Sequence, residues 1–212
     1  HTMAKFKMPF MHRITQSMAD NTYVRSKGKN ILKTKIEENS SNTAKQQKQR
    51  LKMKTVVQLC KAFNAAAHMG FPERPIDFTS WNAFTRANLP AVTVSDNLEV
   101  SIDYEKLRVS QGSLEVMEDV EVVKNAEEHS LTFTHSGDSY GYGMNADDLL
   151  HAVVFEQTKR RSRVFKLNER EDELPMSIHI PTTWDMEQLS VYVFVLSANG
   201  RKASDSEWME VK

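Results

Sequence analysis

The chain has 212 residues, of which 40% are apolar and 26% are charged, as is typical of a soluble globular protein with one large or two small domains. Its single cysteine, Cys60, excludes an internal disulfide and a multi-cysteine zinc site. The net charge of zero hides two opposite parts: residues 1–61 carry fourteen basic and three acidic side chains (+11), and residues 62–212 carry fourteen and twenty-five (−11).

The N-terminal segment shows patterns of a hairpin followed by a linker. Residues 11–27, MHRITQSMADNTYVRSK, predict a short β-hairpin, because part-apolar stretches around Ile14 and Tyr23 flank the turn-forming sequence ADN. Residues 28–42 are polar and contain Gly, Asn and Ser, so we expect a loop or linker there. The sequence contains no signal-peptide pattern and no apolar stretch near the ~20 residues of a membrane span, which predicts a cytoplasmic protein without a membrane partner.

A long amphipathic helix is predicted from Thr43, a favourable N-cap residue, to about Met69, with Gly70 as its C-terminal stop. At helical periodicity, one apolar stripe is formed by Val56, Leu59, Cys60, Phe63, Ala66 and Ala67. We interpret Cys60 as a small buried apolar residue rather than as a reactive thiol.

The N-terminal half of this helix is basic. Lys45, Lys48 and Lys52 lie on the apolar stripe, and Arg50, Lys54 and Lys61 lie on the opposite face. Cations near a helix N-terminus oppose the helix dipole by about 0.3–1 kcal/mol each. Burying unpaired ammonium groups costs more. We therefore expect the last four turns to pack on the body of the protein and the first turns to project from it, towards a negatively charged partner.

A second, shorter helix is predicted over residues 79–89, capped by Thr79 or Ser80 and ended by Pro90. From about residue 98 the apolar residues alternate with period two, which indicates short strands. The strand-like segments are residues 98–110, 119–125, 130–135, 150–157, 162–167, 176–180, 189–197 and 207–211. Their spacing is typical of an antiparallel β-sandwich. Val191–Leu196 is apolar on both faces and is therefore expected to be a central strand.

The closing stretch LSVYVFVLSANGRKASDSEWMEV resembles the last hairpin of fibronectin type III and immunoglobulin-like domains. The stretches MAKF, VRSKG, NTAKQQKQRLKM, IDYEKLRVSQGSL and YVFVLSANGRKASDSEW resemble an uncharacterised family of Bacteroidota, a domain of unknown function, over nearly the full length. That resemblance implies a bacterium, a phage or a mobile element as the source, and it implies no activity.

The predicted fold class is α+β, with an N-terminal basic arm and two helices followed by an antiparallel immunoglobulin-like β-sandwich. The expected divisions are residues 1–42 (basic arm, hairpin and linker), 43–96 (helical segment) and 97–212 (sandwich).

The motifs of common enzymes are absent from the sequence: it has no G-x-S-x-G, no P-loop and no H-E-x-x-H. GDSYGYG lies between predicted strands and is read as a loop, and Asp138, Asp147 and Asp148 do not have the spacing of an EF-hand. The sequence KRRSR (159–163) is read as a solvated hairpin tip, with an anion or partner contact as the alternative. We therefore predict no catalytic residue, no cofactor and no metal.

The basic N-terminal third is the candidate binding region, for which three interpretations compete. It is a solvated arm, it binds nucleic acid through phosphates, or it docks on an acidic protein, the nearest being another copy of this chain. Aromatic residues for base stacking are scarce before residue 60, which disfavours nucleic acid.

We expect a non-enzymatic structural or interaction protein that forms a homo-oligomer, such as a phage-like or mobile-element assembly component, cytoplasmic or virion-associated; nucleic-acid binding is the alternative. The candidate binding residues are Arg25, Lys27, Lys29, Lys33, Lys35, Lys45, Lys48, Arg50, Lys52 and Lys54.

Overall fold

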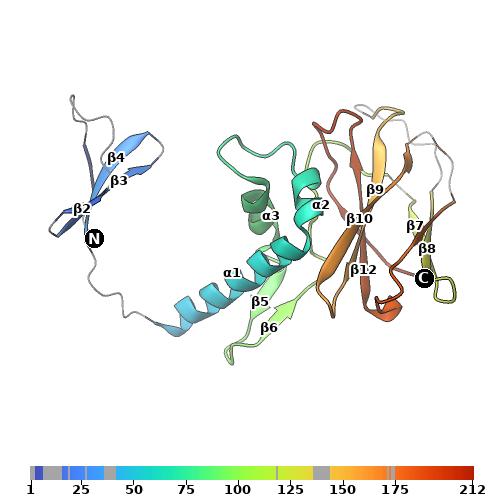
Figure 1. The fold of residues 1–212 in the computed structure, drawn as a ribbon, viewed down its shortest axis with the longest axis horizontal. Coiled ribbons are helices and arrows are strands. Elements are labelled where there is room, and N and C mark those ends of the chain that lie inside the picture. The colour runs from blue at the N-terminus through green and yellow to red at the C-terminus, as the bar shows by residue number, and fades with distance from the viewer. Residues whose placement is uncertain are drawn as a thin grey trace. The chain divides into compact units, whose positions relative to one another are not determined.

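The computed structural model of the chain divides into two compact units, His1–Thr43 and Ala44–Lys212 (Figure 1). It describes residues 3–6, 16–18, 20–26, 28–35, 42–117, 119–135, 144–170, 172 and 175–212. Within these ranges three α-helices combine with strands in several antiparallel sheets, which confirms a mixed α+β fold. None of the helices in the described part of the chain is long and apolar enough to span a bilayer.

The first unit contains a four-stranded sheet in the order β1-β4-β3-β2. Its strands are β1 (Met3–Phe6), β2 (Gln16–Met18), β3 (Asn21–Ser26) and β4 (Lys29–Thr34). The predicted hairpin is confirmed for β2 and β3, which pair from Met18 and Asn21 onwards. The part of that prediction around Ile14 lies outside the described residues.

The prediction of a loop over residues 28–42 is wrong in its first part, because β4 lies there. Gly28 has a φ of +76° in the tight connection between β3 and β4, a conformation that glycine adopts without steric cost. Ile31 and Leu32 then pair with Val24 and Tyr23 across the strands. These cross-strand apolar pairs stabilise β4 in spite of its polar neighbours in the sequence.

The second unit begins with three helices where two were predicted: α1 (Ala44–Ala62), α2 (Asn64–Gly70) and α3 (Ser80–Asn88). The predicted long helix is interrupted at Phe63, although helical hydrogen bonds continue through it, from Phe63 N–H to Leu59 O (2.8 Å) and from Ala67 N–H to Phe63 O (2.8 Å). The predicted apolar stripe of α1 and α2 is confirmed, since all six of its side chains are buried.

Gly70 ends α2, but its role is steric. A Cβ atom at this position would lie 2.2 Å from the carbonyl oxygen of Val109, so only glycine lets the two backbones approach this closely. The predicted cap of α3 is confirmed: the backbone N–H of Asn82 donates to Thr79 Oγ1 over 3.2 Å.

Among the described residues of the second unit, the strands form one two-stranded, one three-stranded and one four-stranded sheet, in the orders β5-β6, β11-β8-β7 and β10-β9-β12-β13. Their bounds are β5 Val92–Val94, β6 Val100–Ile102, β7 Glu121–Asn125, β8 Ser130–Thr134, β9 Leu149–Glu156, β10 Arg161–Glu169, β11 Met176–His179, β12 Leu189–Leu196 and β13 Glu207–Met209, with a 3-10 helix at Met186–Gln188. β12 pairs with β9 on one side and β13 on the other, which confirms its predicted central position.

The four-stranded sheet is apolar on both faces because it belongs to two cores. Phe155 and Tyr192 pack with the helices, where the rings of Phe63 and Phe155 stack with centroids 4.5 Å apart. Val154 and Val193 face the other way and pack with the sheet β11-β8-β7. The helices therefore add a third layer to the two facing sheets.

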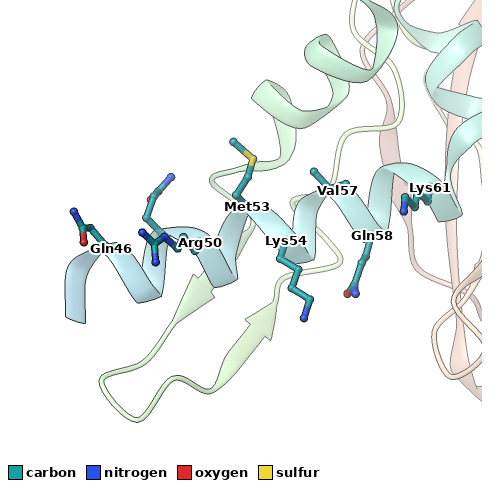
Figure 2. A pocket seen from close by; sticks show the side chains of 8 residues that line it. Gln46, Arg50, Met53, Lys54, Val57, Gln58 and Lys61 are labelled. Carbon is teal, nitrogen blue, oxygen red and sulfur yellow. The ribbon is translucent and has the colours of Figure 1, made fainter. Parts of the chain in front are cut away.

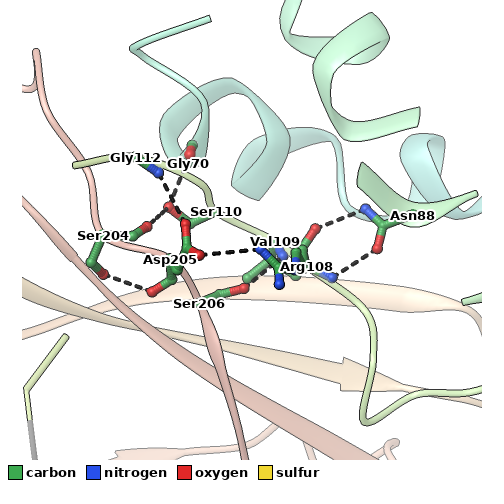
Figure 3. A network of polar contacts seen from close by, with 9 residues as sticks. All are labelled: Gly70, Asn88, Arg108, Val109, Ser110, Gly112, Ser204, Asp205 and Ser206. Carbon is green, nitrogen blue, oxygen red and sulfur yellow. Dashed lines mark hydrogen bonds and ion pairs between the residues drawn. The ribbon is translucent and has the colours of Figure 1, made fainter. Parts of the chain in front are cut away.

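The segment after β6 was predicted to be a strand as far as residue 110, but only Val100–Ile102 has that structure. Residues 108–112 instead lie between the helices and residues 204–206, held by polar contacts (Figure 3). Ser110 Oγ lies 2.9 Å from Gly70 O and 2.7 Å from Ser204 O, and Val109 N–H donates to Ser206 Oγ over 2.9 Å. These side-chain bonds replace the ladder of a sheet.

Candidate functional site

The ten candidate binding residues are distributed over both units. Arg25, Lys29, Lys33 and Lys35 belong to the first unit, in or next to β3 and β4. Lys27 lies outside the described residues. Lys45, Lys48, Arg50, Lys52 and Lys54 belong to α1 in the second unit. Each unit therefore has its own basic side chains.

The candidate residues of the first unit do not share one surface. Lys29 and Lys33 are four residues apart on β4 and therefore point to one side of the sheet, together with Thr22, the partner of Lys33. Arg25 pairs with Asn30 and therefore points to the other side. All three side chains are exposed.

In the second unit, one side of α1 lines an open groove of about 680 Å³ (Figure 2). We call this side the α1 outer face; it consists of Gln46, Gln49, Arg50, Met53, Lys54, Val57, Gln58 and Lys61. Met53 and Val57 form its apolar centre, and Met53 is 41% exposed. Basic and amide side chains surround that centre, and α1 contains six basic and no acidic residues. The face therefore combines an apolar contact area with positive charge.

The other side of α1 is occupied within the chain. Lys48 Nζ forms an ion pair with Asp96, in the turn between β5 and β6. The hydrogen bond and charge of Lys48 hold the pKa of Asp96 below its usual range. The prediction that the first turns of α1 stand clear of the body is therefore wrong on this side, because they lie against the β5–β6 hairpin.

The turn between β9 and β10, read as a solvated tip, lies next to the C-terminal end of α1. Arg160 Nη1 donates to Gln58 Oε1 over 3.3 Å, and Ser162 Oγ donates to the carbonyl oxygen of Ala62 over 2.7 Å. Together with Lys61, Arg161 and Arg163 this turn lines a second pocket, of about 490 Å³. The basic surface thus continues from the α1 outer face onto the sheet.

The β5–β6 hairpin itself was missed by the sequence reasoning, although it carries a charge signal. Residues 87–105 contain Asp96, Glu99, Asp103 and Glu105 and no basic residue. The turn is closed by Ser95, whose N–H donates to Glu99 O over 2.9 Å and whose Oγ accepts from Glu99 N–H over 3.1 Å. An acidic hairpin thus lies beside the basic helix.

Buried titratable groups in the described part of the chain serve the fold. Arg170 and Asp148 are 1% and 0% exposed, with Arg170 Nε 3.9 Å from Asp148 Oδ2, and Arg170 Nη2 donates to Glu115 O over 2.9 Å. Burial raises the pKa of the Cys60 thiol to about 11, which agrees with its prediction as a packing residue. Among the described residues, no three His, Cys, Asp or Glu side chains gather as metal ligands.

Comparison with known proteins identifies a family whose function is unknown. The model of DUF6266, a family of unknown function, matches residues 13–210. No curated protein and no solved structure matches the chain.

Proposed function

We propose that this chain, which belongs to the DUF6266 family of unknown function, is a non-enzymatic interaction protein that self-associates by docking a basic surface on an acidic one. The observation that carries the proposal is the α1 outer face. Met53 and Val57 offer apolar contact area, and Arg50 and Lys54 beside them select a negatively charged partner. An apolar centre with a polar, charged rim is the usual composition of a protein–protein interface.

The partner surface is available on a second copy. Residues 62–212 have eleven more acidic than basic side chains, whereas α1 has six basic and no acidic ones. Opposite charges on two surfaces increase the rate at which they associate. Like charges decrease that rate. Contact between unlike surfaces of identical chains closes into rings or extends into filaments.

An assembly role is the more specific part of the proposal. The two antiparallel sheets that share a core support an immunoglobulin-like sandwich in the strand-rich part. Domains of this kind are common in particle-forming proteins, so we propose a phage-like or mobile-element assembly component, in the cytoplasm or in virions. This step rests on analogy between folds.

Nucleic-acid binding is a second candidate, favoured by one observation. Arg160, Arg161 and Arg163 lie beside Lys61, so cations extend beyond α1 in a row suited to phosphates. Stacking side chains are scarce there: Trp184, the aromatic residue of that pocket, is 8% exposed. The apolar centre of the α1 outer face also has no use in phosphate binding, so we favour a protein partner.

Size-exclusion chromatography with light scattering, at about 50 mM and about 500 mM salt, tests the proposal, because salt screens exposed charges. We expect association at low salt that decreases at high salt and is lost in the double variant Arg50→Glu/Lys54→Glu. The control is Arg201→Glu/Lys202→Glu, the same charge change on an exposed turn. A monomer at both salts that shifts duplex or single-stranded DNA in a gel would support the second candidate.

A further inference from the structure

The tip of the β5–β6 hairpin presents apolar side chains to solvent among acids. Leu98 is 41% exposed and Val100 is 38% exposed, and Asp96 and Glu99 flank Leu98 in the sequence. The described residues include five exposed large hydrophobic side chains, and three of them, Leu98, Val100 and Met53, belong to this tip or to the α1 outer face. Leu98 and Val100 lie two residues apart on the tip, whereas Met53 lies on the α1 outer face, so the second unit exposes apolar side chains at two separate places.

Leu98 is also in an unfavourable backbone conformation. Its φ is +62°, in the left-handed region that glycine and asparagine tolerate and that a branched, bulky side chain avoids. The turn holds this conformation, because Leu98 N–H donates to Ser95 O over 3.2 Å. A leucine here costs free energy both through its backbone and through its exposure, without a compensating role in the core. Strain of this kind is a reason to look for a contact outside the chain.

The tip cannot reach the outer face of its own helix. Asp96 pairs with Lys48, which lies on the side of α1 opposite Arg50, Lys54 and Val57. The hairpin therefore lies against one side of α1 and leaves the other side open for a different molecule. The acidic side chains of the tip complement the basic side chains of the open side, and its apolar side chains complement the apolar centre there.

We propose that the β5–β6 tip of a second copy of this chain docks on the α1 outer face, with Leu98 and Val100 against Met53 and Val57. This inference rests on the proposed function and identifies the segment that occupies the α1 outer face. Glu99 of one copy then meets Arg50 and Lys54 of the other, so that charge complementarity sets the register of the contact. The apolar centre of the α1 outer face and the strained leucine have one common explanation in this contact.

A charge exchange tests the contact. The helix variant is Arg50→Glu/Lys54→Glu, and the tip variant is Asn97→Lys/Glu99→Lys, which leaves Asp96 and its ion pair in place. Sedimentation velocity over a concentration series should show that each variant alone self-associates at least about tenfold more weakly than the wild type, because like charges then face each other. An equal mixture should associate much better than either variant alone, since each contact joins unlike charges where the two variants alternate in the assembly.

Two controls separate the docking contact from general effects of charge and folding. Glu127→Lys/Glu128→Lys changes another exposed acidic turn and should leave association unchanged. Leu98→Asn changes no charge and suits the left-handed backbone, yet it should weaken association about threefold or more by removing apolar contact. Circular dichroism melts should show each variant folded before its association is compared.

The outcomes distinguish the inference from the function on which it rests. If only the helix variant associates more weakly, and the tip variant and Leu98→Asn associate like the wild type, the hairpin is not the occupant. Self-association through α1 would still stand in that case. Failure of the mixture to recover also overturns the inference. A wild type that remains monomeric at low salt and high concentration overturns both.

Discussion

Replacing Asn88 by alanine should remove the anchor that joins α3 to the segment after β6. Asn88 is 0% exposed, and its side-chain amide makes three hydrogen bonds. Nδ2 donates to Phe84 O over 2.9 Å. Nδ2 also donates to Arg108 O over 2.8 Å, and Oδ1 accepts from Arg108 N–H over 2.7 Å (Figure 3). The pair of bonds to Arg108 imitates the backbone pairing of two strands.

The magnitude follows from what the variant leaves unpaired. The N–H and C=O groups of Arg108 would each lose their partner, and an unsatisfied buried group costs about 1–3 kcal/mol. Water reaches this part-buried pair in part, and alanine gains about 0.5 kcal/mol in helix propensity. We therefore expect Asn88→Ala to lower the free energy of unfolding by about 2–3 kcal/mol. For a chain of this size the midpoint of thermal unfolding should fall by about 4–12 °C.

Urea unfolding followed by circular dichroism measures this loss, with Asn82→Ala as the matched control. Asn82 lies in the same helix with its side chain exposed, so its replacement should change the free energy of unfolding by less than about 0.5 kcal/mol. A loss in Asn88→Ala no larger than in the control would refute the reasoning, because the paired bonds to Arg108 would then contribute nothing to the fold.

Three further predictions concern buried groups. Tyr192→Phe should cost about 1 kcal/mol, because Tyr192 Oη donates to Tyr104 O over 2.8 Å, and urea unfolding measures it. Burial lowers the pKa of His151 below 6.5, so the unfolded chain takes up the proton at a higher pH than the folded chain does. The free energy of unfolding should therefore be highest above pH 6.5 and decrease as the pH falls. Urea midpoints from pH 7.5 to 5 should show this decrease, and a smaller one in His151→Gln. Cys60, with its pKa raised to about 11, should react with iodoacetamide only after denaturation, which mass spectrometry would detect.

The helices were predictable because their signals are local. The stripe from Val56 to Ala67 repeats at helical spacing, and Thr79 is an N-cap residue before a helix-forming run. The central strand Val191–Leu196 was predictable for a related reason: a segment apolar at every position has to be covered on both faces. In each case a few neighbouring residues determine both the element and its burial.

What the sequence did not reveal depends on contacts between distant residues. β4 is stabilised by Ile31 and Leu32 opposite β3, and nothing within its own polar sequence indicates this pairing. Gly70 reads as a helix stop, but the approach of Val109, almost forty positions later, is what requires a glycine. The β5–β6 hairpin was missed because β5 has only three residues, too few for alternation to show, although β6 lies within the strand predicted over residues 98–110.

For the five candidate residues of α1, the sequence predicted a basic surface, and the structure divides these residues between two sides of the helix. Sequence periodicity placed Arg50 and Lys54 opposite the apolar stripe, and the structure shows them around the open groove of the α1 outer face. Periodicity could not show that Lys48 is paired, because Asp96 is forty-eight residues away and comes near only through the hairpin. The contribution of the β9–β10 arginines was likewise out of reach, since it requires Ser162 to contact the end of α1.

The two sides of α1 explain in physical terms how the helix can begin with basic residues. A helix that begins with cations is opposed by its own dipole, and the penalty decreases within the first turn. Lys48 meets the carboxylate of Asp96 on the side towards the hairpin, while Lys61 in the last turn is favoured by the dipole. Arg50 and Lys54 lie beyond the first turn, where the dipole opposes them little, and neither is needed by the buried stripe. The helix thus has a folding surface on one side and the proposed docking surface on the opposite side, so charge on the outer side can change without loss of the buried stripe.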